Sequence, residues 1–494
     1  MGVSYHTILG VKKQPSTGIS NKLPKSNPKI TTKRNNSRID LTAGPILKTL
    51  ISLAVPVTIS MVMFTIYLLV DLYFVGRLGP DAVAALSISS NAFFIHLGFS
   101  TILGTGGMAL VAQAFGRKDY GHAAQVFKQS ILMALCIGIL ETATGLLIAP
   151  SYIKFFGGTG KSLQWGIQYF QIFSISFFFM ILLYVIGNCF RGMGNTKTPM
   201  IILLQANILN IILDPILIFG WLGLPAMGVR GAAIASLISQ IYALAIYAYF
   251  IFIIGAHIDV KGPWRLSRSI VAKSLYIGIP SGMNHFLLAV NLLITYRVIS
   301  IYGTAALASI GIGFRILQAI YIPVIALASA MAAIIGQNFG ANQYSRITGT
   351  LWCAWAISMV FMICCTVISR LFPENLIGIF SNDPDVIHFG VIYLSIFSLG
   401  YVAVGTIMVT AAAFQGLGKT YPCLIGAALD NALFVALVLT LPAFFGWGIQ
   451  SVWWIKLATA IAEAAAVAAW LRWELQRVRS NMISVLGAGK LQCS

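Results

Sequence analysis

Long apolar segments separated by short polar ones make up most of the chain, from Leu47 to Trp473. A helix needs roughly 20 mainly apolar residues to cross a bilayer, and segments of this length recur along the whole pattern. A β-barrel would instead show short segments of alternating polarity, which the sequence lacks. We therefore predict an all-α integral membrane protein. The pattern predicts twelve membrane-spanning helices, at residues 47–75, 83–112, 124–149, 164–190, 199–220, 229–255, 270–299, 304–335, 348–370, 386–412, 421–443 and 450–473.

The first apolar segment, Leu50–Gly76, is interrupted by one acidic residue, Asp71. A carboxylate inside a membrane helix is costly, so Asp71 is a functional-site hypothesis. The alternative is that Asp71 lies close enough to the helix end to reach the interface. Pro56 lies inside the same helix, where proline removes a backbone hydrogen bond and bends the chain. We predict that Pro56 is a hinge whose bend changes between states.

Composition narrows the class of protein. Of 494 residues, 58% are hydrophobic and 9% are charged, which excludes a chain of several soluble domains. The formal net charge of +19 would suit a nucleic-acid partner if the basic residues formed one surface. They are instead concentrated in the tails and in alternate loops, as the positive-inside rule describes. We therefore expect membrane lipids, and no nucleic acid, as partners.

The basic residues also predict the orientation. Most of the 32 Lys and Arg residues fall on the side that holds both chain ends. This bias places both termini in the cytoplasm of a multi-pass protein of the cell's inner, cytoplasmic membrane. The exceptions are Arg77, Lys154, Lys161, Arg230, Arg297 and Arg370 on the opposite side, and Arg315 and Lys456 inside apolar segments.

The two ends of the chain differ from the apolar segments. Residues 1–44 are rich in Lys, Ser, Asn, Thr and Pro, and Asp40 is their only acidic residue. Such a segment cannot bury a core, so we predict a disordered, basic cytoplasmic tail, and a second cytoplasmic tail at 476–494. No apolar segment precedes Leu50, so no cleavable secretory signal is expected, while an organelle transit peptide stays open. The seven Cys residues have neither metal-site nor disulfide spacing.

The chain repeats itself at an offset of about 224 residues. Pro56 corresponds to Pro280, and VAQAFGRKDY (111–120) corresponds to IGQNFGANQY (335–344). FRGMGNTKTP (190–199) corresponds to FQGLGKTYP (414–422) with one residue deleted. Internal repeats are typical of transporters. Because six helices per repeat is an even number, both halves enter the membrane in the same direction. We predict two six-helix lobes related by a pseudo-twofold axis along the membrane normal: an N-lobe at 45–256 and a C-lobe at 270–475, joined by a cytoplasmic loop at 257–269.

Polar residues of the N-lobe converge at one depth. Asn207, Asn210 and Asp214 share one face of the fifth helix, because positions i, i+4 and i+7 lie on the same side. Ser236 lies about two turns inside the sixth helix, at a depth similar to Asp214 and Asp71. Oxygen ligands of this kind suit hard cations. The alternative is that Asn210 and Asp214 only hold helices together.

These features together resemble the multidrug and toxic compound extrusion (MATE) family, closer to its DinF-like branch. The resemblance covers residues 45–475 and rests on Pro56 and Asp71 in the first helix, GQNFGA at 336–341 and RGMGNTKTP at 191–199. It implies antiport that exports small organic compounds, cationic or amphipathic, in exchange for H⁺ or Na⁺. By resemblance the N-lobe cation site comprises Asp71, Asn210, Asp214, the carbonyl of Ala232 and Ser236, where the family usually has Thr. Asp71, Asn210 and Asp214 would then hold Na⁺.

The coupling ion cannot be chosen from the sequence. Two carboxylates that lie close together cannot both stay charged at low cost, so Asp71 and Asp214 can exchange a proton for a cation. Five oxygen donors also fit Na⁺. The acidic residues that a NorM-like pattern would place in the seventh and tenth helices are missing. We expect no cofactor besides the coupling ion, and a monomer.

Other polar residues within apolar segments are candidates for the cavity or the substrate site. They are Asn207, His96, Glu141, Arg315 and Asp430. His96 and Glu141 either line the N-lobe or pair with neighbours. Arg315 and Asp430 either pair across the C-lobe or contact substrate. Lys456, near the outer start of its helix, is expected to extend its ammonium group towards the interface.

The sequence also bears on three other classes of function. A lipid-linked oligosaccharide flippase of the same superfamily is the main alternative, although such proteins usually carry several cationic cavity residues and here only Arg315 qualifies. An intramembrane enzyme would need a protease dyad or a metal cluster, and neither pattern is present, so we predict no enzyme. GGTGKS (157–162) and GLGKT (416–420) lack the first Gly of a phosphate-binding loop and follow no strand. An ion gradient is therefore the expected energy source.

Overall fold

The structure is a computed structural model that describes residues 40–254, 260, 262–445 and 448–491. The predicted tail at 1–44 therefore lies mostly outside the described residues, as do parts of the predicted loop at 257–269 and of the tail at 476–494. Within the described ranges the regular structure is helical. The main helices are α1 (Ile46–Gly76), α2 (Pro80–Ser90), α3 (Ala92–Gly116), α4 (Tyr120–Phe155), α5 (Gly160–Gly192), α6 (Lys197–Phe219), α7 (Val229–Tyr249), α8 (Arg268–Ile299), α9 (Thr304–Gly340), α10 (Tyr344–Leu371), α11 (Pro373–Gly378), α12 (Pro384–Phe397), α13 (Tyr401–Leu417), α14 (Tyr421–Phe445) and α15 (Gln450–Leu491).

Twelve helical spans in the described part of the chain are long and apolar enough to cross a membrane, as the sequence predicts. α2 and α3 form one span with a break at Asn91, and α12 and α13 form another, joined by the short 3₁₀ turn Ser398–Gly400. α7 continues into one π-helical turn, Phe250–Ile254. The spans match the predicted ranges closely, and α15 continues beyond its predicted end to Leu491.

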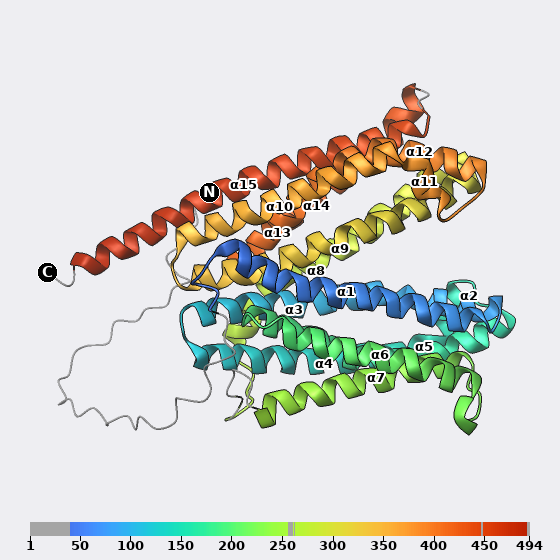
Figure 1. The fold of residues 1–494 in the computed structure, drawn as a ribbon, viewed down its shortest axis with the longest axis horizontal. Helices are drawn as coiled ribbons and strands as arrows, with labels where there is room; N and C mark the ends of the chain where they lie inside the picture. Colours follow the sequence, from blue (N-terminus) through green and yellow to red (C-terminus); the bar gives the residue numbers. More distant parts are fainter. Residues whose placement is uncertain (1–39, 255–259, 261, 446–447, 492–494) are drawn as a thin grey trace. The chain divides into compact units, whose positions relative to one another are not determined.

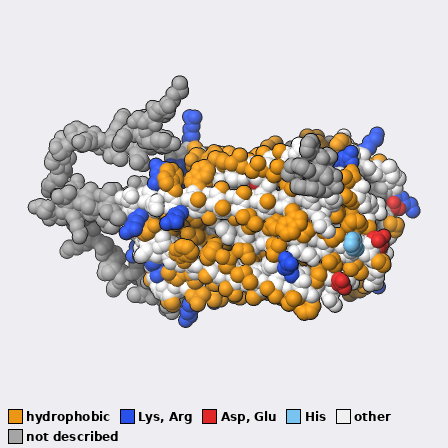
Figure 2. Space-filling model, turned by 90° about the horizontal axis from the view of Figure 1, so that it is seen from above, with side chains coloured by type: hydrophobic (Ala, Val, Ile, Leu, Met, Phe, Trp, Pro, Cys, Tyr) orange, Lys and Arg blue, Asp and Glu red, His pale blue; other side chains and the backbone are white. Residues whose placement is uncertain are grey.

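The spans run side by side and alternate in direction (Figure 1). We call the end at which α1 begins and α15 ends the inner end, and the opposite end the outer end. Figure 2 shows a broad hydrophobic surface between the two ends, with Lys and Arg side chains near both ends and Asp and Glu side chains near the outer end. Leu147 on α4, for example, is 81% exposed. Exposed apolar side chains of this kind suit contact with lipid, and the charged side chains at the two ends suit contact with water and lipid headgroups.

Each predicted lobe packs around an inner and an outer cluster of buried apolar side chains. In the N-lobe the inner cluster centres on Phe127, Phe190 and Tyr247, and the outer cluster includes Phe170 and Ala232. The C-lobe has corresponding clusters, one around α9 and α13 and one around α9, α12 and α15. The described residues of the two lobes nevertheless belong to one compact unit.

The two lobes meet through a reciprocal contact at the inner end. A Cβ atom on Gly116 would lie 1.8 Å from the backbone oxygen of Gln337, and one on Gly340 would lie 2.1 Å from that of Gln113. The side chain of Gln113 donates to the oxygen of Gly416 at 3.0 Å. In the same way Gln337 donates to the oxygen of Gly192 at 2.9 Å. The repeated sequence motifs therefore form one of the surfaces by which the lobes touch, and only glycine allows this close approach.

The segment before α1 is held by the C-lobe. Asn338 on α9 donates to the carbonyl oxygen of Leu41 at 3.1 Å. The guanidinium group of Arg346, at the start of α10, donates to the carbonyl oxygens of Ala43 at 3.1 Å and Gly44 at 2.9 Å. The side chain of Thr42 donates to Asp40 and lowers the pKa of that carboxyl. The start of the N-lobe is thus tied to the C-lobe at the inner end.

Candidate functional site

The predicted cation ligands come together between three helices of the N-lobe. α1 packs against α6, and α6 packs against α7. Asp71 on α1 is 4% exposed, Asp214 on α6 is fully buried, and Asn210 and Ser236 are buried beside them. Ala232 lies one helical turn before Ser236 and is also fully buried. Because each helix has its polar positions on one face, packing these faces together forms a polar cluster inside an otherwise apolar lobe. We call these five residues the N-lobe cluster.

Hydrogen bonds connect α6 to α7 and α7 to α1. The side-chain amide of Asn210 is oriented so that both its nitrogen and its oxygen have hydrogen-bond partners. Its nitrogen donates to Asp214 Oδ2 at 3.1 Å. The same amide accepts from the backbone N–H of Ser236 at 3.1 Å and from its hydroxyl at 3.3 Å. That N–H is also the helical partner of the Ala232 carbonyl, so the two oxygens share one donor. The hydroxyl of Ser236 lies 2.9 Å from the hydroxyl of Tyr67 on α1.

Both carboxylates retain an oxygen without a partner. Asp71 Oδ1 and Asp214 Oδ1 are buried, and neither has a hydrogen-bond partner among the described residues. The cluster contains no basic side chain, and Asp71 and Asp214 lie close enough to affect each other's charge. A buried carboxylate oxygen without a donor or a cation is costly. The cluster is therefore suited chemically to receive a proton or a small cation.

Two tyrosines beside the cluster were not predicted from the sequence. Tyr67 lies one helical turn before Asp71 on α1, and its hydroxyl bonds to Ser236. Tyr169 on α5 is buried and interacts electrostatically with Asp71 and Asp214. The i, i+4 spacing of Tyr67 and Asp71 is a signal that places both on one face. Tyr169 has no comparable signal, because its helix carries no acidic residue.

His96 and Glu141 pair with each other. His96 Nδ1 on α3 lies 3.0 Å from Glu141 Oε2 on α4, and His96 Nε2 lies 3.1 Å from the hydroxyl of Ser100. The imidazole ring also stacks on Phe177 at a centroid distance of 4.7 Å. Of the two hypotheses, pairing with a neighbour is the one that the geometry supports. Asn207 is half-buried on the face of α6 that carries Asn210, and no hydrogen bond from its side chain is found among the described residues.

Of the two alternatives for Arg315 and Asp430, the one in which they pair with each other is wrong. Arg315 on α9 is exposed, whereas Asp430 Oδ2 on α14 lies 2.7 Å from the ammonium nitrogen of Lys456 on α15. The expectation that Lys456 extends towards the interface is therefore also wrong. The physical reason is that Asp430 is 6% exposed, and a buried carboxylate attracts the nearest cation more strongly than the interface does.

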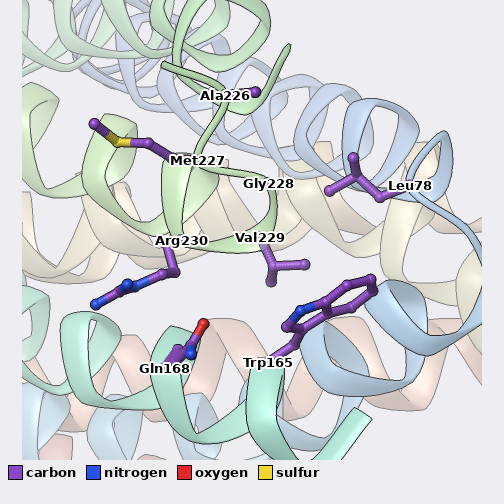
Figure 3. A pocket seen from close by; sticks show the side chains of 8 residues that line it. All are labelled: Leu78, Trp165, Gln168, Ala226, Met227, Gly228, Val229 and Arg230. Carbon is purple, nitrogen blue, oxygen red and sulfur yellow. The ribbon is translucent and has the colours of Figure 1, made fainter. Parts of the chain in front are cut away.

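A separate cavity of 270 Å³ lies at the outer ends of helices that form the N-lobe cluster (Figure 3). Leu78 lies two turns beyond Asp71 on the α1 side, and Val229 lies two turns before Ser236 on α7. The five residues of the N-lobe cluster do not line this cavity. Because the guanidinium group of Arg230 repels cations, we do not assign the cavity to the same site. Its lining residues are Leu78, Trp165, Gln168, Ala226, Met227, Gly228, Val229 and Arg230.

The described residues contain no group of three or more His, Cys, Asp or Glu side chains suited to a metal ion. A cation at the N-lobe cluster would rely on the mixed set of two carboxylates, an amide, a hydroxyl and a backbone carbonyl. Such neutral and anionic oxygen donors suit hard cations rather than transition metals. The geometry thus agrees with a site that binds and releases an ion.

Known proteins resemble the chain in sequence and in fold. The multidrug export protein MepA of Staphylococcus aureus is 24% identical over 430 residues, which cover 86% of this chain and 93% of that protein. The probable multidrug resistance protein NorM of Thermotoga maritima is 27% identical over 380 residues, covering 77% and 82%. A solved structure described as the outward-facing conformation of a multidrug resistance MATE family transporter has a TM-score of 0.83 at 24% identity, and covers 90% of this chain and 99% of that chain.

The family assignment rests on matches in both halves of the chain. The MatE family matches residues 56–216 and 280–439, which together are more than half of the sequence. The two matched ranges fall in the two predicted lobes and begin at the corresponding prolines, Pro56 and Pro280. MATE proteins are transport proteins and not enzymes. The chain therefore belongs to the MATE family of membrane transporters.

Proposed function

We propose that the protein is a cation-coupled antiporter, which exports small organic compounds in exchange for H⁺ or Na⁺. The names of the relatives, a multidrug export protein and a probable multidrug resistance protein, support the export of drug-like compounds, which we propose are cationic or amphipathic. The proposal includes the cell's inner membrane as the location and both termini in the cytoplasm. The charge bias of the loops supports this orientation.

One observation carries the proposal: two buried carboxylates, Asp71 and Asp214, each keep an oxygen without a partner in a cluster that has no basic residue. A structural polar contact would normally satisfy such atoms. An ion that arrives and leaves during a cycle satisfies them only part of the time. Exchange at this cluster can therefore be linked to a change in the packing of α1, α6 and α7.

Alternating access needs the lobes to separate at one end and close at the other. The close contact of Gly116 with Gln337 and of Gly340 with Gln113 corresponds to a state that is closed at the inner end. Pro56 lies inside α1 between this contact and Asp71, and has no N–H for the carbonyl of Ser52. We propose that α1 bends at Pro56 when Asp71 gains or loses its ion.

Reconstitution tests the proposal directly. Purified protein in liposomes is given an imposed pH gradient or Na⁺ gradient, and movement of a fluorescent lipophilic cation is recorded. We expect dye movement only with one of the two gradients, and its loss when an ionophore collapses that gradient. Equal movement with and without any gradient would contradict antiport. Movement of a lipid-linked sugar without a dependence on either ion would favour the flippase alternative.

A further inference from the structure

The C-lobe contains a second polar cluster between three of its own helices. α14 packs against both α8 and α15. Asn291 on α8 donates to Asn431 Oδ1 on α14 at 2.9 Å, and Lys456 on α15 donates to Asp430 Oδ2 at 2.7 Å. Thr295, one turn beyond Asn291, is buried in the same region. We call these five residues the C-lobe cluster.

The C-lobe cluster corresponds to the N-lobe cluster through the sequence repeat. The offset of 224 residues places Asn291 on Tyr67 and Thr295 on Asp71. After the one-residue deletion, Asp430 corresponds to Asn207 on the polar face of α6. At the last helix of each lobe, Gly228-Val229 corresponds to Gly448-Ile449, and this places Lys456 on Ser236. The ammonium group of Lys456 is therefore attached to the helix position that carries a cation ligand in the other lobe.

The surroundings of Lys456 are those of a bound cation. Its nitrogen lies 2.7 Å from Asp430 and 5.1 Å from the ring centre of Phe434, and both contacts stabilise a positive charge. Glu463, two turns further along α15, is half-buried and interacts electrostatically with Lys456 and Asp430. Two carboxylates, Asp430 within the cluster and Glu463 beside it, therefore act on one ammonium group.

The ammonium group does not satisfy every atom of the site. Asp430 Oδ1 is buried, and it has no hydrogen-bond partner among the described residues. The side chain of Lys456 keeps 20% of its area exposed, against 6% for Asp430. Most buried polar atoms of native structures have a hydrogen-bond partner, so the open oxygen of Asp430 is acceptor capacity that Lys456 does not use. Asp430 can therefore accept more hydrogen bonds than the one that Lys456 donates to it.

We propose that the C-lobe cluster is a second cation site, filled by the protein's own ammonium group, that of Lys456. The ligand class is a monovalent cation, and above all a primary ammonium, which offers the same N–H donors. Its consequence for transport rests on the cation-coupled function proposed above: the C-lobe carries a tethered cation through the cycle and takes up no free one. Coupling then needs one ion site, that of the N-lobe.

The test removes the tethered cation and offers a free one. A double variant carries Lys456→Ala together with Asp71→Asn, and the second substitution disables the N-lobe site. The measurement is of stability and needs no transport. Thermal unfolding is followed with increasing ethylammonium chloride, and with tetramethylammonium chloride at equal concentration as the salt control. We expect a saturable rise of several degrees in the melting temperature with ethylammonium only. The matched control, which also carries Asp430→Asn, should show no such rise.

The outcomes separate this proposal from the proposed function. No stabilisation by ethylammonium, or the same stabilisation in the Asp430→Asn control, would overturn the second cation site whatever the transport assay shows. If Lys456→Ala does not yield folded protein, Lys456→Met keeps the apolar stem against Phe434 and undergoes the same titration. If neither variant folds, Asp430→Asn alone is compared with the unchanged protein for modification of Lys456 by an amine-reactive reagent. Faster modification is expected, and an equal rate rejects the proposal.

Discussion

The two polar clusters lie on corresponding helices of the two lobes, but their charges differ. The carboxylates of the N-lobe cluster have no basic partner, whereas the carboxylate of the C-lobe cluster has one. In the N-lobe, Asp71 and Asp214 are buried with open oxygens and no basic neighbour. In the C-lobe, the position of Asp71 is taken by Thr295, and the buried Asp430 has its own cation in Lys456. The architecture is repeated while the chemistry is not. A duplicated fold therefore does not imply a duplicated ion site.

Under the proposed function, this difference would let the N-lobe respond to an ion while the C-lobe does not. An unpaired buried carboxylate is costly, so binding a proton or a cation changes the stability of the N-lobe packing. A carboxylate already paired with a tethered ammonium gains little from a free ion, because the partner is always present. The comparison leads us to propose that coupling resides in the N-lobe and that the C-lobe gives structural support.

The largest effect is expected from removing one N-lobe carboxylate. Asp71→Asn keeps the size of the side chain but fixes it as neutral, so neither a proton nor a cation is exchanged. Gradient-driven efflux from liposomes should fall to the level of protein-free liposomes. Asp214→Asn should impair efflux strongly, because it also weakens the contact with Asn210. Protein yield and melting temperature serve as the folding check.

The repeat supplies the control for this prediction. Thr295→Ala alters the C-lobe position that corresponds to Asp71, but it removes only a hydroxyl that donates to the carbonyl of Asn291 on its own helix at 2.8 Å. Transport should change little. The comparison between the lobes fails if Asp71→Asn transports normally, or if Thr295→Ala is as damaging as Asp71→Asn.

The features that the sequence predicts well are those that depend on one segment at a time. Helix length and polarity suffice to predict twelve spans. The face shared by Asn210 and Asp214 follows from helical spacing alone. Position along the first and sixth helices adds Asp71 and Ser236, and the family resemblance adds the carbonyl of Ala232. The structure brings all of these residues together in one cluster.

Features that depend on which faces meet could not be predicted in this way. Arg315 and Asp430 are both charged residues of the C-lobe, and nothing in their spacing indicates that Asp430 faces Lys456 instead. The bond from Tyr67 to Ser236 joins residues 169 positions apart. The outer cavity depends on a turn before α7 that brings Met227 and Gly228 beside Trp165. Each of these depends on packing between helices, which hydrophobic periodicity does not encode.

A smaller effect is expected where the two lobes are alike. In Gly116→Ala the new Cβ atom would lie 1.8 Å from the backbone oxygen of Gln337, so the lobes cannot approach as closely at the inner end. Overpacking of this kind costs about 1–3 kcal/mol, which should lower the melting temperature and slow transport. Gly340→Ala should behave similarly because the contact is reciprocal.

Gly378→Ala, at the end of α11, is the matched control, because its new Cβ atom would meet no atom within 4 Å. It should change neither the melting temperature nor the transport rate. A large loss in Gly116→Ala with none in Gly340→Ala would show that the inner contact is not equivalent in the two lobes. This outcome would revise the comparison.

A moderate effect is expected from the prolines that the repeat aligns. Pro56→Ala restores the N–H that the carbonyl of Ser52 lacks, which stiffens the helix that carries Asp71. Transport should slow several-fold at normal protein yield. Pro280→Ala makes the same change in α8, which carries no acidic residue, and should slow transport less. If both variants transport at the same rate as the unchanged protein, Pro56 only bends α1 and is not a hinge.

The smallest effect on activity, and the sharpest test of the repeat itself, comes from single cysteines placed in each lobe. Parallel repeats require the α4–α5 loop of the N-lobe and the α11–α12 loop of the C-lobe to lie on the same side of the membrane. In a background with the seven native cysteines replaced, Lys161→Cys and Asn382→Cys should both react with an impermeant thiol reagent added to intact cells. Both side chains are exposed, so their reactivity reports the side of the membrane on which they lie.

Ser345→Cys at the inner end should react only after lysis, because the charge bias places that end in the cytoplasm. Labelling of Lys161→Cys and Asn382→Cys from opposite sides would mean that the lobes are inverted repeats, and the correspondence of Asp71 with Thr295 would no longer hold.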